Sequence, residues 1–170
     1  MKFERYQHVE KLGNLEVNDI TIGKCFIFPK IDGTNASVWL EDNKINAGSR
    51  NRHLTGFGNK EDNHGFFQWV SSNDNVKNLL EKHPKLRLFG EWLIPHSVKT
   101  YRKDAWKRFY VFDVIHDEKG YLTYDEYKPI LDEYDVDYIP PIAVVENPSD
   151  DMLMKLLEKN VFLNQEIQLI

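Results

Sequence analysis

Cysteine is nearly absent from this 170-residue chain, which contains only Cys25. A single cysteine excludes an internal disulfide and a cysteine-rich zinc site, and it is typical of proteins in a reducing cytoplasm. No apolar run approaches the roughly 20 residues that a membrane span needs. The polar stretch Met1–Glu10 does not resemble a signal peptide. We therefore expect a cytoplasmic protein with no membrane partner, and the sequence leaves its oligomeric state open.

Positive charge is also scarce, since 22 Lys and Arg residues face 27 Asp and Glu residues, for a net charge of −5. This balance argues against a generally basic nucleic-acid-binding surface, so any such contact must be local. Linkers rich in glycine, serine or proline and internal repeats are lacking as well. The length predicts one domain, residues 1–170, that is large enough to bury a real core.

Short apolar and β-branched runs predict strands at residues 24–28, 34–40, 45–49, 86–93 and 108–115. In the last of these strands, period-two alternation predicts one face made of Tyr110, Phe112 and Val114 and another made of Phe109, Val111 and Asp113. The polar residues 50–63 predict a mobile loop between strands.

Helices are predicted between and after these strands. Residues 75–83 place three apolar side chains on one face and end before Pro84. Thr123 and Glu126 form a capping box, but Pro129 predicts that this helix stops after one turn and that a second one follows. Ser149 caps a further short helix whose buried face we expect to carry Leu153, Leu156 and Leu157. Strands and helices alternate without a βαβ rhythm, so the fold class is α+β.

The chain is organised around residues 25–35, which read C-F-I-F-P-K-I-D-G-T-N. A short apolar strand delivers Lys30 to a turn, and Gly33 lets a ligand approach the backbone. This placement suits a covalent lysine nucleophile, which must be neutral to attack phosphorus. The alternative interpretation is a surface turn, since Asp-Gly is a common turn pair.

Three more segments match what nucleotide chemistry at this lysine needs. Arg50, in G-S-R, could form a fork of hydrogen bonds on a phosphate or bind a ribose hydroxyl, or it could be a solvated loop residue. Glu91, in F-G-E-W, must face solvent or a ligand, because a carboxylate in an apolar strand is costly to bury. The strand F-Y-V-F-D-V could stack one aromatic ring on a purine or use all of them in the core.

In this order, these four motifs resemble the covalent nucleotidyltransferase superfamily of ligases and capping enzymes. K-I-D-G-T-N and G-E-W-L-I-P-H are most similar to phage-type ATP-dependent RNA ligases, and the match covers roughly residues 20–115. The resemblance implies an adenylation domain with antiparallel sheets and flanking helices. It also implies ATP and Mg²⁺ as cofactors and RNA ends or nicked RNA as substrates. Lys30 would then form a lysyl-AMP intermediate before RNA 5′-phosphate and 3′-hydroxyl ends are sealed.

The same resemblance assigns the nucleotide-binding residues. Arg50 matches the second motif, Glu91 the ribose-binding glutamate and Phe112 the ring that stacks on adenine. Asn35 would lie near the phosphates or the metal, and no residue is assigned as a metal ligand. The implied nucleotide-binding set is Ile31, Asp32, Gly33, Asn35, Arg50, Glu91 and Phe112.

The sequence departs from the family in two places. Phe28 stands where DNA ligases carry a glutamate, so adenine selection by that side chain is lost. A later glutamate motif of the E-G form and a final pair of lysines are missing after Phe112. We therefore expect a domain that lacks its last strands, binds ATP weakly and adenylylates itself slowly or not at all. A capping-type guanylyltransferase and a non-catalytic nucleotide- or RNA-binding remnant remain alternatives.

A basic segment spans residues 99–108. It carries +4, so the rest of the chain carries −9. Concentrated positive charge with interleaved Tyr101 and Trp106 is typical of a local site for RNA phosphates and unpaired bases. The predicted RNA-binding residues are Lys99, Arg102, Lys103, Lys107 and Arg108, and the alternative is a solvated loop.

Overall fold

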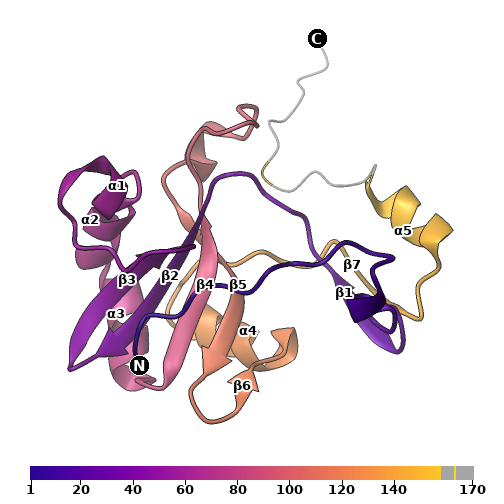
Figure 1. Ribbon diagram of the computed structural model, residues 1–170, viewed down its shortest axis with the longest axis horizontal. Coiled ribbons are helices and arrows are strands. Elements are labelled where there is room, and N and C mark those ends of the chain that lie inside the picture. The colour runs from indigo at the N-terminus through magenta and orange to yellow at the C-terminus, as the bar shows by residue number, and fades with distance from the viewer. Residues whose placement is uncertain (158–162, 164–170) are drawn as a thin grey trace.

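The computed structural model describes residues 1–157 and 163. Its main sheet has five strands in the order β3-β2-β4-β5-β6, and every neighbouring pair is antiparallel. These strands are β2 (Thr34–Glu41), β3 (Lys44–Ser49), β4 (Leu86–Trp92), β5 (Phe109–His116) and β6 (Gly120–Tyr121). A smaller antiparallel sheet pairs β1 (Lys24–Ile27) with β7 (Ala143–Glu146). Figure 1 shows the two sheets side by side, which confirms the α+β prediction.

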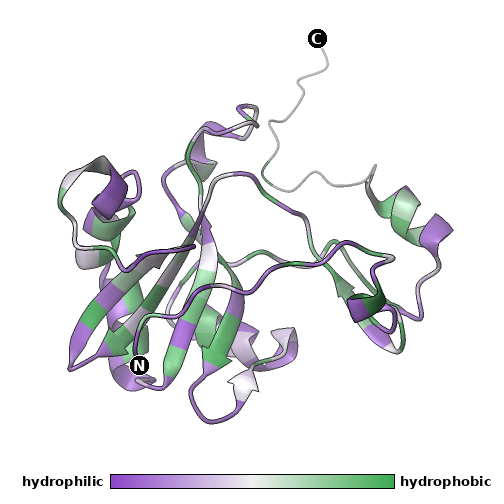
Figure 2. Cartoon of the chain, viewed as in Figure 1, coloured by the Kyte–Doolittle hydropathy of each residue, from purple (hydrophilic) through white to green (hydrophobic). Residues whose placement is uncertain are grey.

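Five α-helices and two short 3₁₀ helices complete the described chain: α1 (Gly58–Asp62), α2 (Phe66–Ser71), α3 (Asp74–Lys82), α4 (Tyr124–Glu133), α5 (Asp150–Leu157), η1 (Leu15–Val17) and η2 (Lys103–Ala105). Helices α2, α3 and α4 cover one face of the main sheet. Their apolar side chains, Leu79 and Tyr127 among them, form one buried cluster with alternate residues of the strands, such as Val38. The alternation of apolar and polar residues along these strands is visible in Figure 2.

Two helix predictions need correction. Helix α4 is continuous although Pro129 lies inside it. Proline removes only its own bond to the carbonyl four residues earlier, and burial of Tyr127 and Leu131 on one side of the helix favours its continuation. The predicted loop 50–63 contains the short helix α1, whose first residue, Gly58, has a positive φ.

The predicted faces of β5 are also partly wrong. A register shift in β4 pairs Phe89 with Asp113 and Gly90 with Val111, so Phe112 is an extra residue in β5. This β-bulge reverses the alternation after it. Val114 therefore joins Phe109 in the main core, whereas the prediction placed them on opposite faces.

The other face of the main sheet is crossed by residues 1–6, called here the N-terminal segment. In Figure 1 this part of the chain passes in front of the strands, on the side away from the helices. The ring of Phe3 packs 6.0 Å from that of Trp39, and the ring of Tyr6 packs 5.1 Å from that of Phe89. The side chains beneath the segment are buried although the segment forms no strand there.

The smaller sheet contacts the rest of the molecule through α4. Tyr124 lies against the rings of Phe26 and Phe28, at 5.5 and 5.7 Å between centroids, and Lys24 forms an ion pair with Asp125 at 2.9 Å. Pro29 is buried and ends β1, so Lys30 leaves the sheet at this point.

Helix α5 begins as predicted, because the hydroxyl of Ser149 accepts a hydrogen bond from the backbone N–H of Met152 at 3.3 Å. Leu153 and Leu156 are half-buried, whereas the side chain of Leu157 and the end of the chain at Leu169–Ile170 lie outside the described part. In residues 1–157, no helix is long and apolar enough to cross a membrane.

Candidate functional site

Glu91 is the half-buried centre of the candidate site. It lies on β4 directly opposite Asn35 of β2, and its Oε1 accepts the backbone N–H of Gly33 at 2.8 Å. Burial raises the pKa of its carboxyl group, while the N–H of Gly33 and then the charges of Lys30 and Arg50 act in the opposite direction. Three of the predicted motifs therefore meet around one carboxylate.

Lys30 itself is exposed, directly after the buried Pro29. Burial therefore does not supply the activation that a nucleophilic amine needs. Its neighbour Ile31 is 5% exposed and packs with Leu93 and Tyr101 in a second core cluster. The side chain of Ile31 thus anchors the lysine turn to the fold, and a nucleotide contact by this residue would have to come from its backbone.

Gly33 is required because the backbone of β4, and not a ligand as expected, lies close to it. A Cβ at this position would lie 2.4 Å from the carbonyl oxygen of Trp92, which is a backbone atom and cannot easily move. The absence of a side chain allows β2 to begin tightly against β4. It also lets the N–H of Gly33 reach Glu91.

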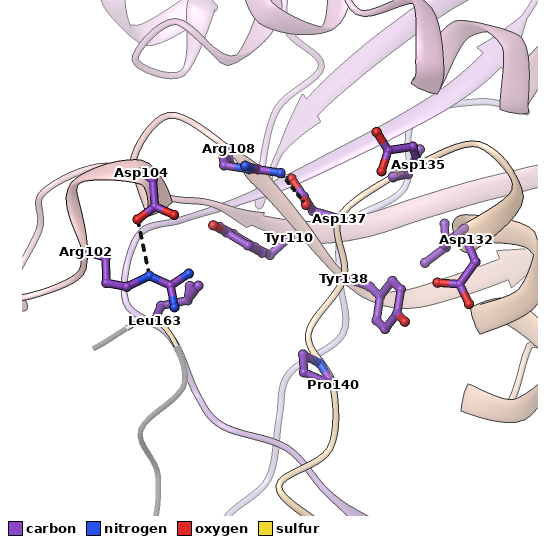
Figure 3. Close-up of a pocket in the computed structure, with 12 residues that line it drawn as sticks. Arg102, Asp104, Arg108, Tyr110, Asp132, Asp135, Asp137, Tyr138, Pro140 and Leu163 are labelled. Carbon is purple, nitrogen blue, oxygen red and sulfur yellow. Dashed lines mark hydrogen bonds and ion pairs between the residues drawn. The ribbon is translucent and has the colours of Figure 1, made fainter. Parts of the chain in front are cut away.

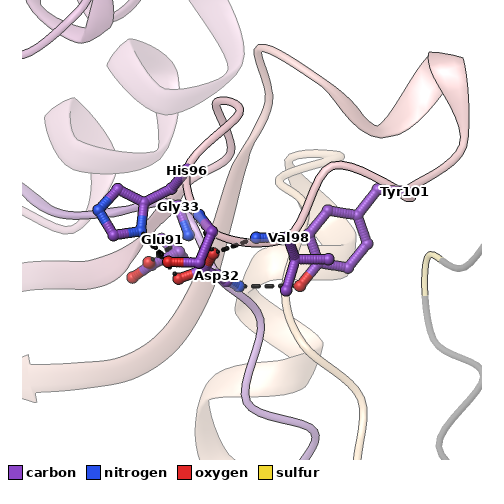
Figure 4. A network of polar contacts seen from close by, with 7 residues as sticks. Asp32, Gly33, Glu91, His96, Val98 and Tyr101 are labelled. Carbon is purple, nitrogen blue, oxygen red and sulfur yellow. Dashed lines mark hydrogen bonds and ion pairs between the residues drawn. The ribbon is translucent and has the colours of Figure 1, made fainter.

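Asp32 ties the lysine turn to the loop that follows β4, as Figure 4 shows. Its carboxylate accepts the N–H groups of Ser97 and Val98, both at 2.7 Å, and contacts Nδ1 of His96 at 3.1 Å. The bond from Val98 is the main cause that lowers the pKa of Asp32. The backbone N–H of Asp32 also donates to the hydroxyl of Tyr101 at 2.9 Å. Asp32 therefore connects Lys30 to the loop that leads into the basic segment.

Asn35 presents an unused acceptor to the site. Its side-chain oxygen Oδ1 is buried and has no hydrogen-bond partner among residues 1–157, which is rare for a buried polar atom. Its backbone carbonyl accepts the amide of Asn63 at 3.4 Å, and Asn63 also holds Thr34 at 3.1 Å. An open oxygen beside Glu91 suits a donor from a ligand or from a metal-bound water.

Phe112 packs against the second core cluster, to which Ile31 belongs, and contacts Tyr6, a residue that the motifs did not identify. The ring of Tyr6 meets that of Phe112 edge-on at 5.0 Å, and its hydroxyl donates to Asp113 at 2.5 Å. Burial raises the pKa of Asp113 and is also the main cause that raises the pKa of Tyr6. The charge of Arg50 acts on Tyr6 in the opposite direction and is the weakest of the causes that shift its pKa.

Pattern reasoning missed Tyr6 for two reasons. It lies 24 positions before Lys30 in a polar stretch with no strand or helix period. Asp113 was expected on the face opposite Phe112, and only the bulge brings both residues to Tyr6. The one sequence signal was a pair of aromatic residues, Phe3 and Tyr6, among charged neighbours.

The basic segment is partly neutralised. Arg108 forms a two-pronged ion pair with Asp137 at 2.6 and 2.7 Å, and Nε of Arg102 lies 3.2 Å from Asp104. Both arginines line a pocket of about 400 Å³, shown in Figure 3. The predicted lysines of the segment are exposed and form no ion pair with the described residues: Lys99, Lys103 and Lys107.

The two antiparallel sheets, with helices covering one face of the main sheet, are the fold of solved RNA ligase structures. Residues 23–167 match the family model of the RNA ligases, and the chain belongs to the RNA ligase family. No curated protein matches the sequence.

Solved structures of similar fold come from Naegleria gruberi. Its RNA ligase with PPi is 22% identical, covers 79% of this chain and gives a TM-score of 0.63. A glutamate-to-alanine variant of that ligase with ATP and Mn is 21% identical, covers 86% of this chain and gives a TM-score of 0.67. The matched region is 40% and 45% of those two chains, so the present chain spans less than half of their length.

Proposed function

We propose that this chain is the adenylation domain of an ATP-dependent RNA ligase, a single domain over residues 1–170. Lys30 attacks the α-phosphorus of ATP, a phosphoramidate bond forms, and pyrophosphate leaves. The AMP passes to an RNA 5′-phosphate, and a 3′-hydroxyl then displaces it to seal the strand. The observation that carries this proposal is the hydrogen bond at 2.8 Å by which the half-buried carboxylate of Glu91 holds Gly33 of the lysine turn, with the charges of Lys30 and Arg50 acting on the same carboxylate.

Each residue of the site has a chemical task in this reaction. Glu91 accepts ribose hydroxyls through Oε2, for which no partner is found within residues 1–157, while Oε1 remains on Gly33. Arg50 is exposed and forms no ion pair with the described residues, so its guanidinium is available to a phosphate. Phe112 stacks on the base.

The purine end of the site is closed by Tyr6 and Asp113. An ionised Asp113 accepts hydrogen bonds only, so it suits the exocyclic amine of adenine and repels the carbonyl oxygen that guanine carries there. This supplies the base selection that Phe28 cannot give, and it favours ATP over GTP.

The described residues offer too few ligands to hold a magnesium ion by themselves, so the phosphates of the nucleotide would have to supply further ligands. No group of three His, Cys, Asp or Glu side chains with metal-binding geometry occurs in the described part of the chain. Asn35 offers an oxygen ligand in Oδ1, and magnesium commonly takes one or two protein oxygens together with waters and phosphates. When bound, it would offset the negative charge of the pyrophosphate that leaves. The Naegleria structures with ATP and Mn or AMP and Mn support this assignment.

Labelling with radioactive nucleotide tests the proposal. The purified chain is incubated with α-labelled ATP or GTP and Mg²⁺, and the protein is assayed for covalent, acid-labile label. We expect slow labelling by ATP and none by GTP. Preferred label from GTP would favour a capping-type guanylyltransferase, and no label from either nucleotide would favour a non-catalytic remnant.

A further inference from the structure

Arg87 is a buried cation without an anionic partner. It lies in the middle of β4, is 2% exposed, and forms no ion pair with a carboxylate of the described residues. Burial lowers the pKa of its guanidinium. An unpaired buried charge costs several kcal/mol, so a role for this residue must be sought in what it binds.

Its guanidinium binds the backbone of the N-terminal segment. Nη1 donates to the carbonyl oxygen of Glu4 at 3.4 Å, and Nη2 donates to that of Lys2. The same group lies over the ring of Trp39, 4.8 Å from its centroid, and 5.8 Å from that of Phe89. These carbonyls would otherwise face an apolar sheet surface without partners. Arg87 therefore fixes a segment that has no strand partner of its own.

The position of the segment decides what borders the candidate site. Two residues after Glu4, Tyr6 reaches the ring of Phe112 and the carboxylate of Asp113. At its other end, Phe3 packs against Trp39 and against Gly48, where a Cβ would come within 2.9 Å of the ring. The segment is thus held at Phe3 and at Arg87 and forms a wall of the site at Tyr6.

We propose that Arg87 is a positioning residue of the nucleotide site. By binding the carbonyls of Lys2 and Glu4, it holds the N-terminal segment across the main sheet and places Tyr6 beside Phe112 and Asp113. This inference rests on the proposed function, because it takes Phe112 as the ring that stacks on the base. Arg87 itself need not contact the nucleotide.

The Arg87→Met substitution separates positioning from stability. Methionine keeps a long apolar stem and removes a buried charge, a change that is often neutral or stabilising. We expect an unchanged or higher melting temperature, faster amide hydrogen exchange in residues 2–8, and an ATP dissociation constant raised on the order of tenfold through loss of the Tyr6 wall. A merely structural role would lower the melting temperature without this pattern.

Two more variants complete the test. Arg5→Met makes the same chemical change at an exposed arginine of the same segment, and we expect it to behave as wild type. Phe3→Ala loosens the segment from its other end, so it should reproduce the faster exchange and the weaker ATP binding even if Arg87→Met does not fold.

Three results would count against the proposals, and they can be told apart. Unchanged exchange in Arg87→Met and Phe3→Ala would overturn the anchoring role. Faster exchange with wild-type ATP affinity would show that the segment is no part of the site. Absence of ATP binding by the wild-type chain would instead overturn the proposed function.

Discussion

Removing the charge of Glu91 tests the site, because the change should affect fold stability and nucleotide binding in opposite directions. In Glu91→Gln the amide oxygen can still accept the N–H of Gly33, which now lies 2.8 Å from Oε1. The substitution removes a charge that burial disfavours, as the raised pKa of Glu91 indicates. Stability at pH 7 should therefore be equal or slightly higher.

Nucleotide binding should respond in the opposite direction. Hydrogen bonds to a charged group contribute about 1.5–3 kcal/mol each. Loss of one such bond to a ribose hydroxyl would weaken ATP binding roughly 10- to 150-fold, at 1.4 kcal/mol per tenfold change.

Calorimetric titration with ATP and thermal unfolding of the same samples measure both effects. The Glu81→Gln variant is a suitable control, since Glu81 is an exposed residue at the end of α3. A melting temperature that falls while ATP affinity stays at the wild-type value would refute the reasoning, and it would make Glu91 a structural residue that holds Gly33.

Three further changes test other parts of the account. Phe112→Leu should weaken ATP binding several-fold with little loss of melting temperature, because ring contact worth about 0.5–1.5 kcal/mol is lost. A lower melting temperature with wild-type ATP affinity would place Phe112 in the core. Asp113→Asn should raise the melting temperature at neutral pH, and this gain should vanish as the pH falls through the folded-state pKa of Asp113, because burial raises that pKa and penalises only the ionised form. A gain that persists at about pH 3 would contradict this cause, since the carboxyl is then neutral in both states. Neutralising Lys99, Lys103 and Lys107 together should weaken RNA binding. The slope of log K against log salt concentration should become shallower by about 2, at roughly 0.7 per phosphate contact on a single strand. An unchanged slope would make these lysines solvated loop residues.

Much of the fold followed from local patterns because local physics decides it. The predicted strand 34–40 is observed as β2, and the turn after it is tight because Asp42 and Asn43 both adopt positive φ. Strands β2 and β3 pair as the hairpin that the sequence predicts, and Arg50 follows directly after β3. Neither result needed knowledge of distant parts of the chain.

The errors arose where distant parts of the chain decide the structure. The bulge opposite Phe89 depends on how β4 and β5 pair, which the alternation within β5 does not reveal. Pro129 is tolerated because α4 buries Tyr127 and Leu131 against the sheet. Arg87 reads in the sequence as one polar residue of an apolar strand, and its role depends on a segment more than 80 positions away.

The most direct test of the account is the dependence of covalent labelling on Lys30. The wild-type chain, Lys30→Ala and Lys30→Arg are incubated with α-labelled ATP and Mg²⁺, and circular dichroism confirms that all three are folded. We predict slow, acid-labile AMP attachment to the wild-type chain and none to either variant, since only the lysine amine of Lys30 can form the phosphoramidate bond. Acid-labile AMP on Lys30→Ala at the wild-type level would contradict the account.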